Sequence, residues 1–214
     1  MKFKGTIIIM VLTSAVTWLV FSIASNQNKS QDSKQTAQVQ GDQSTADHHG
    51  GSTPVSSTTF DKLVGKKALD FTLESYNGEK ITLSSLKGKT VVLFFSEGLM
   101  CYPACWNQIA AFGKDQRFKN ENTLALTIVN DKKEEWKSAI DKMPELVSAA
   151  VLFDTSRSVS NAYGVLSLPS SMHRGQLPGH SYVIVDKSGT IRFAKDDAQM
   201  AVRNDSLISE IQKL

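Results

Sequence analysis

The sequence predicts a three-layer α/β sandwich, in which helices cover both faces of a mixed β-sheet. Two observations indicate this fold class. Strand-like apolar runs alternate with amphipathic, helix-like segments over most of residues 60–214, which is typical of α/β domains. Residues 90–95 are almost wholly apolar, as expected for a central strand that is buried on both faces. A final hairpin adds antiparallel strands and makes the sheet mixed.

The folded part opens with a predicted hairpin. Residues 69–73 alternate between apolar and polar side chains as a half-buried strand does, and residues 80–83 return as the partner strand after a Tyr-Asn-Gly-Glu turn. Residues 84–89 form a short helical turn that a glycine closes, and the central strand over residues 90–95 follows.

The later elements alternate along the chain. Amphipathic spacing and stop signals predict the helices, and short apolar runs predict the strands. The helices are expected over residues 106–119, 133–142, 156–163 and 206–213, and the strands over residues 124–129, 150–153, 181–185 and 190–194. A loop is expected over residues 165–179, directly before the closing hairpin.

The first 24 residues predict a membrane anchor. Lys2 and Lys4 precede an uncharged and mostly apolar stretch over residues 5–24, and about 20 such residues suffice to cross a bilayer. Because lysines lie before this stretch, the positive-inside rule predicts a single-pass protein of the cell membrane with its C-terminal domain extracytoplasmic. The alternative is a cleaved signal peptide, since residues 22–24, Ser-Ile-Ala, fit a cleavage site.

Residues 25–59 are expected to form a disordered tether to a folded domain over residues 60–214. The segment is rich in Gln, Ser, Thr, Asp and Gly, so it cannot bury enough apolar surface to offset the entropy of ordering. His48 and His49 within it could bind copper or zinc weakly, or be a solvated pair. The net charge of +3 is small and dispersed, which argues against a nucleic-acid partner.

The only two cysteines of the chain, Cys101 and Cys105, flank three residues between the central strand and the next helix. A thiol in the first turn of a helix has its pKa lowered by the free N–H groups and the helix dipole, and the thiolate is the reactive form. A second sulfur one turn later lies close enough to form a disulfide with the first. Redox or metal chemistry is therefore expected, and the alternative is a buried, inert pair.

Two stretches carry a family resemblance. ALDFTLESYNGEKITLSSLKGKTVVLFF and HSYVIVDKSGTIRF resemble the opening and the closing hairpin of the thioredoxin-like superfamily, and within it the peroxiredoxin-like group (alkyl hydroperoxide reductase/thiol-specific antioxidant) and its membrane-anchored relatives. The resemblance covers residue 66 to the C-terminus. It implies a thioredoxin-like fold and a thiol-dependent oxidoreductase without a cofactor, which acts on protein thiols and disulfides or on a peroxide.

The expected mechanism uses both cysteines. Cys101 precedes or opens the helix and is the candidate nucleophile that attacks a disulfide or a peroxide O–O bond, and Cys105 then resolves the product into a Cys101–Cys105 disulfide. The sequence leaves open whether the enzyme is a reductase, an oxidase or a peroxidase, and which electron donor serves it.

The stretch around the cysteines departs from the patterns of the family. Thioredoxins have two residues between the cysteines, whereas here there are three. The threonine of typical peroxiredoxins falls on Gly98 when counted from Cys101 and on Tyr102 when counted from Cys105, so Tyr102 or Ser96 would have to supply the hydroxyl. The family's cis-proline corresponds to Pro178, which suggests a cis bond between Leu177 and Pro178.

Four residues beside the cysteines are candidate supporting groups, and each has a plainer alternative. Glu97 could transfer protons or be a solvated loop carboxylate, and Gln108 could bond near the site or be polar surface. Trp106 could cover the disulfide or pack as a helix aromatic. Pro103 is expected to shape the first helical turn, where its missing N–H does little harm.

A second resemblance suggests a different function. Sco-type copper chaperones for cytochrome oxidase also have three residues between their cysteines, and they add a distant His followed by Ser, as in His180-Ser181 here. This alternative implies a copper site of Cys101, Cys105 and His180, because two thiolates and an imidazole suit copper. Met100 would be an accessory ligand. Otherwise His180 is a polar loop residue or supports the thiol chemistry.

Overall fold

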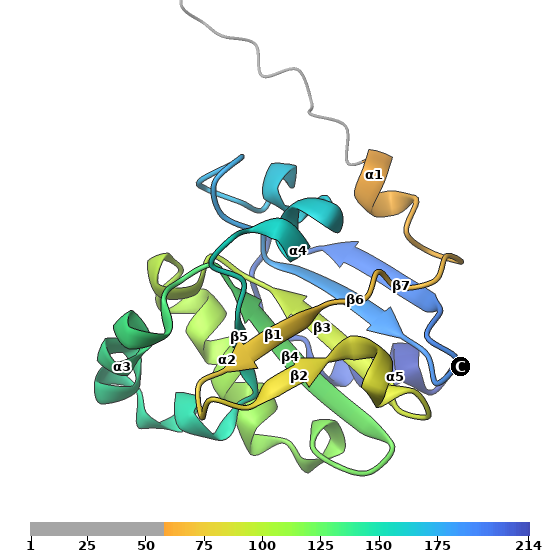
Figure 1. Ribbon diagram of the computed structural model, residues 1–214, viewed down its shortest axis with the longest axis horizontal. Helices are drawn as coiled ribbons and strands as arrows, with labels where there is room; N and C mark the ends of the chain where they lie inside the picture. The colour runs from red at the N-terminus through yellow and green to blue at the C-terminus, as the bar shows by residue number, and fades with distance from the viewer. Residues whose placement is uncertain (1–57) are drawn as a thin grey trace, which may run out of the picture. The chain divides into compact units, whose positions relative to one another are not determined.

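A mixed sheet forms the centre of the computed structural model, which describes residues 58–214. The predicted anchor and nearly all of the predicted tether lie outside these residues. Within residues 58–214, no helix has the length and apolar character needed to cross a bilayer. The strand order is β2-β1-β5-β4-β3-β6-β7, which can be followed in Figure 1.

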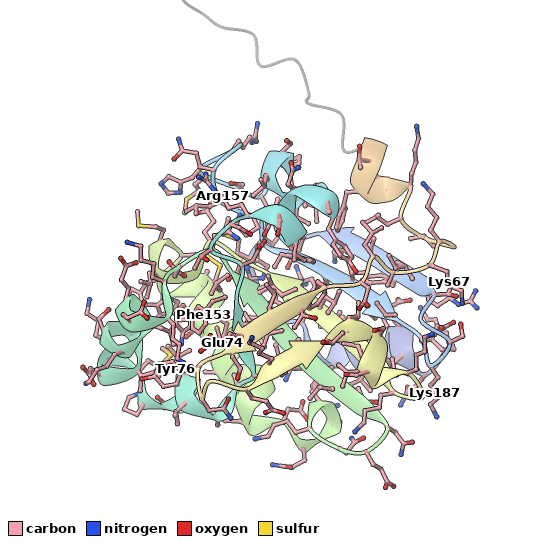
Figure 2. The ribbon with its side chains drawn as sticks, in the orientation of Figure 1. Lys67, Glu74, Tyr76, Phe153, Arg157 and Lys187 are labelled. Atoms are coloured by element: carbon pink, nitrogen blue, oxygen red, sulfur yellow. A yellow bond between two sulfur atoms is a disulfide. The ribbon has the colours of Figure 1, made fainter. Side chains whose placement is uncertain are left out.

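Parallel pairing holds the middle of the sheet and antiparallel pairing its two edges. β3 lies between β4, to which it is parallel, and β6, to which it is antiparallel. At one edge Glu74 lies opposite Phe153 in the antiparallel pairing of β1 with β5 (Figure 2). The strands are β1 (Thr72–Ser75), β2 (Lys80–Thr82), β3 (Thr90–Phe95), β4 (Thr123–Val129), β5 (Val151–Phe153), β6 (Ser181–Val185) and β7 (Ile191–Asp196).

Two separate apolar cores lie on the two faces of the sheet, so the predicted three-layer sandwich is confirmed. Val92 and Phe94 of β3 pack into one core with Trp136, whereas Leu93 and Phe95 pack into the other with Tyr163. All six residues of β3 are buried, which explains the apolar run in the sequence. The first core is covered by α2 (Ala104–Lys114), α3 (Lys133–Lys142) and α5 (Asn204–Ile211), and the second by α1 (Thr58–Asp61), α4 (Ser158–Ala162) and the 3-10 turns η1 (Leu83–Leu86) and η5 (Val165–Ser167).

The expected helix over residues 106–119 differs at both ends. α2 begins at Ala104 and ends at Lys114. The Asp115 carboxylate then accepts the Arg117 N–H, which starts a separate 3-10 turn, η3 (Gln116–Phe118), and buries Phe118. The two remaining 3-10 turns are η2 (Gly98–Met100) and η4 (Pro144–Ser148).

The other elements lie close to their predicted positions, with shifted ends. β1 starts at Thr72 rather than at residue 69, and the helix expected over residues 156–163 is the shorter α4. Arg157, directly before α4, has a positive φ of 61°, a conformation that a right-handed helix cannot include. The predicted bounds of β3, α3 and β6 are confirmed without change.

Candidate active site

The two cysteines are joined in a disulfide at the end of β3, as expected for a redox pair. Their Cα atoms are 5.3 Å apart, and both side chains are buried. Cys101 follows η2, whose turn it closes by donating its N–H to the Gly98 carbonyl at 3.2 Å. Cys105 is the second residue of α2. The thiol in the first helical turn is therefore Cys105, whereas Cys101 precedes the helix without opening it.

Gly98 is required by the packing beside the cysteines. Its φ is +57°, and a Cβ at this position would collide with the Asp131 carboxylate. The Gly98 carbonyl accepts the indole N–H of Trp106 at 3.0 Å, and the neighbouring Leu99 N–H donates to Asp131 at 3.1 Å. No threonine fits where the peroxiredoxin pattern, counted from Cys101, would place one.

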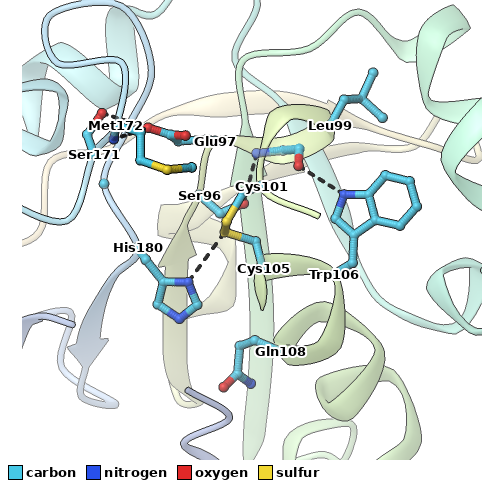
Figure 3. Close-up of a disulfide and its surroundings, with 12 residues drawn as sticks. Ser96, Glu97, Leu99, Cys101, Cys105, Trp106, Gln108, Ser171, Met172 and His180 are labelled. Atoms are coloured by element: carbon cyan, nitrogen blue, oxygen red, sulfur yellow. Dashed lines mark hydrogen bonds between the residues drawn. A yellow bond between two sulfur atoms is a disulfide. The ribbon is translucent and has the colours of Figure 1, made fainter. Parts of the chain in front are cut away.

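His180, the residue directly before β6, contacts the disulfide. Because Phe95 pairs with Ser181, the residue directly before β6 lies beside the end of β3. The Nδ1 atom of His180 lies 3.4 Å from Cys105 Sγ, as Figure 3 shows. Burial lowers the pKa of His180 to about 4, and the Asp197 carboxylate offsets part of that shift. His180 is therefore a buried, neutral imidazole rather than a polar loop residue.

A hydrogen-bonded chain continues from His180 into the protein. Its Nε2 atom lies 2.8 Å from the Tyr182 hydroxyl, which donates to Gln108 Oε1 at 3.0 Å. The Arg203 N–H also donates to Gln108 Oε1, at 2.7 Å, and the Gln108 amide donates to Asn204 at 2.9 Å. Gln108 is thus a buried link between α2, β6 and α5, and not polar surface.

This chain of bonds determines which imidazole nitrogen carries the proton. The Tyr182 hydroxyl donates its one hydrogen to the Gln108 oxygen, so it accepts a hydrogen bond from the Nε2–H group of His180. Burial raises the pKa of Tyr182 above its ordinary value, so the hydroxyl stays protonated. Nδ1 is then left as an acceptor that faces Cys105. Sequence reasoning missed Tyr182, although residues i and i+2 of a strand share a face.

Glu97 is buried, so the expectation of a solvated carboxylate is wrong. It accepts hydrogen bonds from the Ser171 hydroxyl at 2.8 Å, from the N–H groups of Met172 and His173 at 2.6 and 2.9 Å, and from His173 Nδ1 at 3.1 Å. Burial alone would raise the pKa of Glu97, but these bonds outweigh it and lower the pKa. Glu97 therefore ties the loop before β6 to the cysteine segment.

The remaining candidates surround the cysteines in different ways. Tyr102 is 64% exposed and lies edge-on against Trp106 at 5.0 Å between ring centroids. Trp106 is buried and points toward the backbone near Leu99, away from His180 (Figure 3). Pro103 directly precedes α2. The Ser96 hydroxyl is buried and accepts the Gly98 N–H at 3.2 Å.

The suggested cis bond at Pro178 is wrong. Among residues 58–214 the cis bond lies between Tyr102 and Pro103. Pro178 is buried and is separated from His180 by Gly179. The Gly179 N–H donates to the Val165 carbonyl at 2.9 Å, and a side chain there would collide with Ser170. This close approach needs a glycine next to His180, not a proline.

Three potential metal ligands come together at the same place. One ligand atom each from Cys101, Cys105 and His180 lies within 4.8 Å of the others. Two thiolates and an imidazole would suit copper if the disulfide were reduced. His173 is bonded to Glu97 instead, and His48 and His49 lie outside the described residues.

A thioredoxin-like α/β domain with a buried disulfide between strand and helix is the class of protein that these observations define. A model of the AhpC/TSA family matches residues 64–194, more than half of the chain. The chain therefore belongs to the AhpC/TSA family. This confirms the predicted peroxiredoxin-like, thioredoxin-fold domain and agrees with the expected enzyme class, a thiol-dependent oxidoreductase.

The chain is similar to peroxiredoxins of known sequence and structure. It is 31% identical to the chloroplastic peroxiredoxin Q of Sedum lineare over 129 residues, which are 58% of this chain and 63% of the relative. It is 31% identical to that of Arabidopsis thaliana over 162 residues, or 70% and 69% of the two chains. The crystal structure of Enterococcus faecalis AhpC is 18% identical with a TM-score of 0.60, over 71% of this chain and 91% of that chain. The chain spans less than two thirds of the Sedum protein's length.

Proposed function

We propose that this protein is a thiol-dependent oxidoreductase in which Cys101 and Cys105 cycle between a dithiol and a disulfide. One observation carries the proposal: the imidazole of His180 lies 3.4 Å from the Cys105 sulfur of the disulfide, inside a buried network. An inert pair of core cysteines would need neither a disulfide nor an oriented base beside it. Membership in the AhpC/TSA family supports the same chemistry.

The proposed cycle has two exchange steps. The Cys101 thiolate attacks one sulfur of a disulfide, or one oxygen of a peroxide, and forms a mixed disulfide or a sulfenic acid while the other sulfur leaves as a thiolate or the other oxygen as a hydroxide or alkoxide. The Cys105 sulfur then attacks the Cys101 sulfur, so that the Cys101–Cys105 disulfide forms and a thiolate or a hydroxide leaves. Two electrons pass from the protein to the substrate, and an external dithiol returns them.

His180 is assigned to the second step. Its Nδ1 atom accepts the proton of the Cys105 thiol as that sulfur attacks, and the leaving thiolate or hydroxide takes up a proton from solvent. The neutral imidazole suits this role, because a protonated one could not accept. Tyr182 and Gln108 are positioning residues, since they hold the proton on Nε2.

Single cysteine variants test the order of attack. Cys105→Ser should form a stable mixed disulfide with a model disulfide through Cys101, which intact-mass measurement detects. Cys101→Ser should abolish turnover and form no such adduct. If instead Cys105 carries the adduct and Cys101 resolves it, the two roles are reversed, and if neither variant changes turnover the cysteines are not the reactive pair.

We also propose that the folded domain acts on the extracytoplasmic side of the membrane. The lysines before the apolar residues 5–24 support an extracytoplasmic domain, where an oxidising environment favours disulfides. The substrates there are protein thiols and disulfides or a peroxide.

A second candidate function is copper binding, and the 4.8 Å cluster of Cys101, Cys105 and His180 favours it. Titration of the reduced domain with Cu(I) separates the two functions. The oxidoreductase proposal expects weak binding that His180→Ala leaves unchanged, while the rate of disulfide formation falls. Tight binding of one Cu(I) that is lost in His180→Ala would establish the copper function instead.

A further inference from the structure

Three large apolar side chains are exposed on the two loops that border the disulfide. Met100 and Tyr102 flank Cys101 and are 58% and 64% exposed, and Met172, on the loop before β6, is 63% exposed. We refer to Met100, Tyr102 and Met172 as the apolar rim. Exposed apolar side chains that gather at one place mark interaction sites, whereas scattered ones need no explanation.

The two methionines of the apolar rim are both bonded to one residue, Glu97. The Met100 N–H donates to the Glu97 carbonyl at 3.2 Å, and the Met172 N–H donates to the Glu97 carboxylate at 2.6 Å. Figure 3 shows the Met172 side chain reaching from its loop toward the side on which Cys101 lies. Glu97 therefore holds both methionines beside the reactive sulfurs, Met100 through its main-chain carbonyl and Met172 through its buried carboxylate, although the two are 72 positions apart in the sequence.

The polar groups at the sulfurs do not favour a small charged or peroxide substrate. Among residues 58–214, the side chain bonded to either sulfur is that of His180, a neutral imidazole. Counted from Cys101, Gly98 stands where the peroxiredoxin pattern has a hydroxyl, and the Ser96 hydroxyl is buried against the Gly98 N–H. Counted from Cys105 the position is Tyr102, whose side chain is exposed. A small substrate gains little binding energy from the methionines, because they lie beyond the sulfurs. A polypeptide is large enough to cover them.

We propose that the apolar rim binds an extended polypeptide segment in which a cystine has apolar neighbours, so that the substrates of this domain are protein disulfides. The inference rests on the proposed oxidoreductase function and names its substrate class. For thiol exchange, a partner must bring one of its sulfurs into line with Cys101. A polypeptide partner that brings its sulfur there must cover the apolar rim. Methionine suits such a surface, because its flexible thioether adapts to different side chains.

The step balances without a further reactant. The Cys101 thiolate attacks the nearer sulfur of the segment's cystine and the farther sulfur leaves as a thiolate. Cys105 then gives its proton to His180 and attacks Cys101, which releases the second thiolate. The segment gains two electrons and takes up protons from solvent, while the dithiol of this protein becomes the disulfide.

Single-turnover reaction of the reduced protein tests the proposal. The probes are a cystine peptide with Leu and Val neighbours, a matched peptide with Ser and Gly neighbours, and the small disulfide of 2-mercaptoethanol. The wild-type protein should react faster with the first peptide than with the second. Met100→Gln combined with Met172→Gln should lower the rate ratio of the apolar peptide to the small disulfide about tenfold.

Two matched variants isolate the cause. Met100→Leu combined with Met172→Leu keeps the apolar rim apolar, so this variant should retain the wild-type rate ratio. If the ratio depended on the thioether sulfur itself, this variant would lose it. Val64→Gln with Val147→Gln changes two exposed apolar residues elsewhere, which are 49% and 62% exposed, and should leave the ratio unchanged.

Each remaining outcome overturns the inference. An equal reaction with both peptides, or a ratio that the glutamine variant leaves unchanged, shows that the rim binds no polypeptide. If that variant loses binding to phosphatidylglycerol vesicles with its ratio unchanged, the rim contacts a membrane. If the wild-type protein reacts with none of the disulfides, the proposed function has failed as well.

Discussion

Two carboxylates adjoin the cysteine segment from different sides, and their surroundings act on them in opposite ways. Glu97 accepts four hydrogen bonds and has a lowered pKa despite its burial. For Asp131, burial raises the pKa to about 6, and the N–H groups of Leu99 and of Asp131 itself oppose only part of that shift. The number of donors, rather than burial alone, decides the direction in which each pKa is shifted.

Asp131 should make the folded state less stable as the pH rises. Its folded pKa of about 6 lies above the ordinary value of 3.8, so the folded protein holds this proton more strongly, and the contribution to stability is lost as the pH passes from 3.8 to 6. The unfolding free energy of the wild-type protein, relative to Asp131→Asn, should fall by about 2 kcal/mol between pH 4 and pH 7.

Urea denaturation at the two pH values measures this difference. Comparison with the variant is needed because His180, whose pKa is lowered to about 4, changes stability in the opposite direction over nearly the same range. Glu134→Gln, which changes an exposed carboxylate on α3, serves as the control. A wild-type and an Asp131→Asn curve that run parallel from pH 4 to pH 7 would contradict the prediction.

Tyr182→Phe should lower both the stability of the protein and the rate of resolution by Cys105. Loss of the hydroxyl leaves His180 Nε2 and Gln108 Oε1 without their shared partner in a buried region, which costs about 1–3 kcal/mol of unfolding free energy. The proton of His180 is then no longer confined to Nε2, so resolution by Cys105 should slow. Stopped-flow detection of disulfide formation measures this rate, and a stability loss with an unchanged rate would make Tyr182 purely structural.

The loop between η5 and β6 is held to the rest of the domain by side-chain bonds rather than by sheet pairing. Glu97 bonds three consecutive residues of that loop, Ser171, Met172 and His173. The Ser170 N–H adds a bond to the Asp196 carboxylate of β7, and the Arg174 side chain bonds the Pro169 carbonyl within the loop itself. The position of His180 at the disulfide therefore depends on contacts between elements that are distant in sequence.

Glu97→Gln should loosen this loop. An amide oxygen is a weaker acceptor than a carboxylate for several N–H donors, so the unfolding free energy should fall by about 2 kcal/mol or more. Amide exchange at residues 171–173 should accelerate, and cleavage after Arg174 by trypsin should become faster. Glu145→Gln, which removes an exposed carboxylate bonded to Lys114, is the matched control, and equal protection in both variants would contradict the role given to Glu97.

The two apolar cores make the sheet the rigid centre of the domain. β3 contributes to both cores and is paired along both edges, so its C-terminal end is a firm support for the disulfide. The segment that carries Glu97, Gly98 and Cys101 follows directly after that end.

The predicted membrane anchor has a test at the level of the full-length chain. Because residues 5–24 are long enough to span a bilayer, the protein should remain in the membrane fraction after carbonate extraction. Protease added on the extracytoplasmic side should cut within residues 25–59 and release an intact domain. A soluble extracytoplasmic protein that starts at Ser25 would show that a signal peptide had been removed instead.

Local patterns in the sequence were sufficient for the layered fold, the two cysteines and most strand and helix positions. Burial leaves a local pattern in the sequence. A strand that is buried on both faces is an apolar run, as in residues 90–95, and a helix that is buried on one face is an amphipathic stretch, as in residues 133–142. The order of the elements also came from these patterns, and the resemblance to the copper chaperones added the candidate role of His180.

Only the tertiary structure decided what surrounds the sulfurs. Glu97, Gln108 and Tyr182 look like ordinary polar residues in the sequence, and each is buried because its partners arrive from another element. Likewise, Gly98 excludes a hydroxyl only because Asp131 approaches from the end of β4. Burial and hydrogen bonding of a polar group depend on residues far away along the chain, and no local period in the sequence records such contacts.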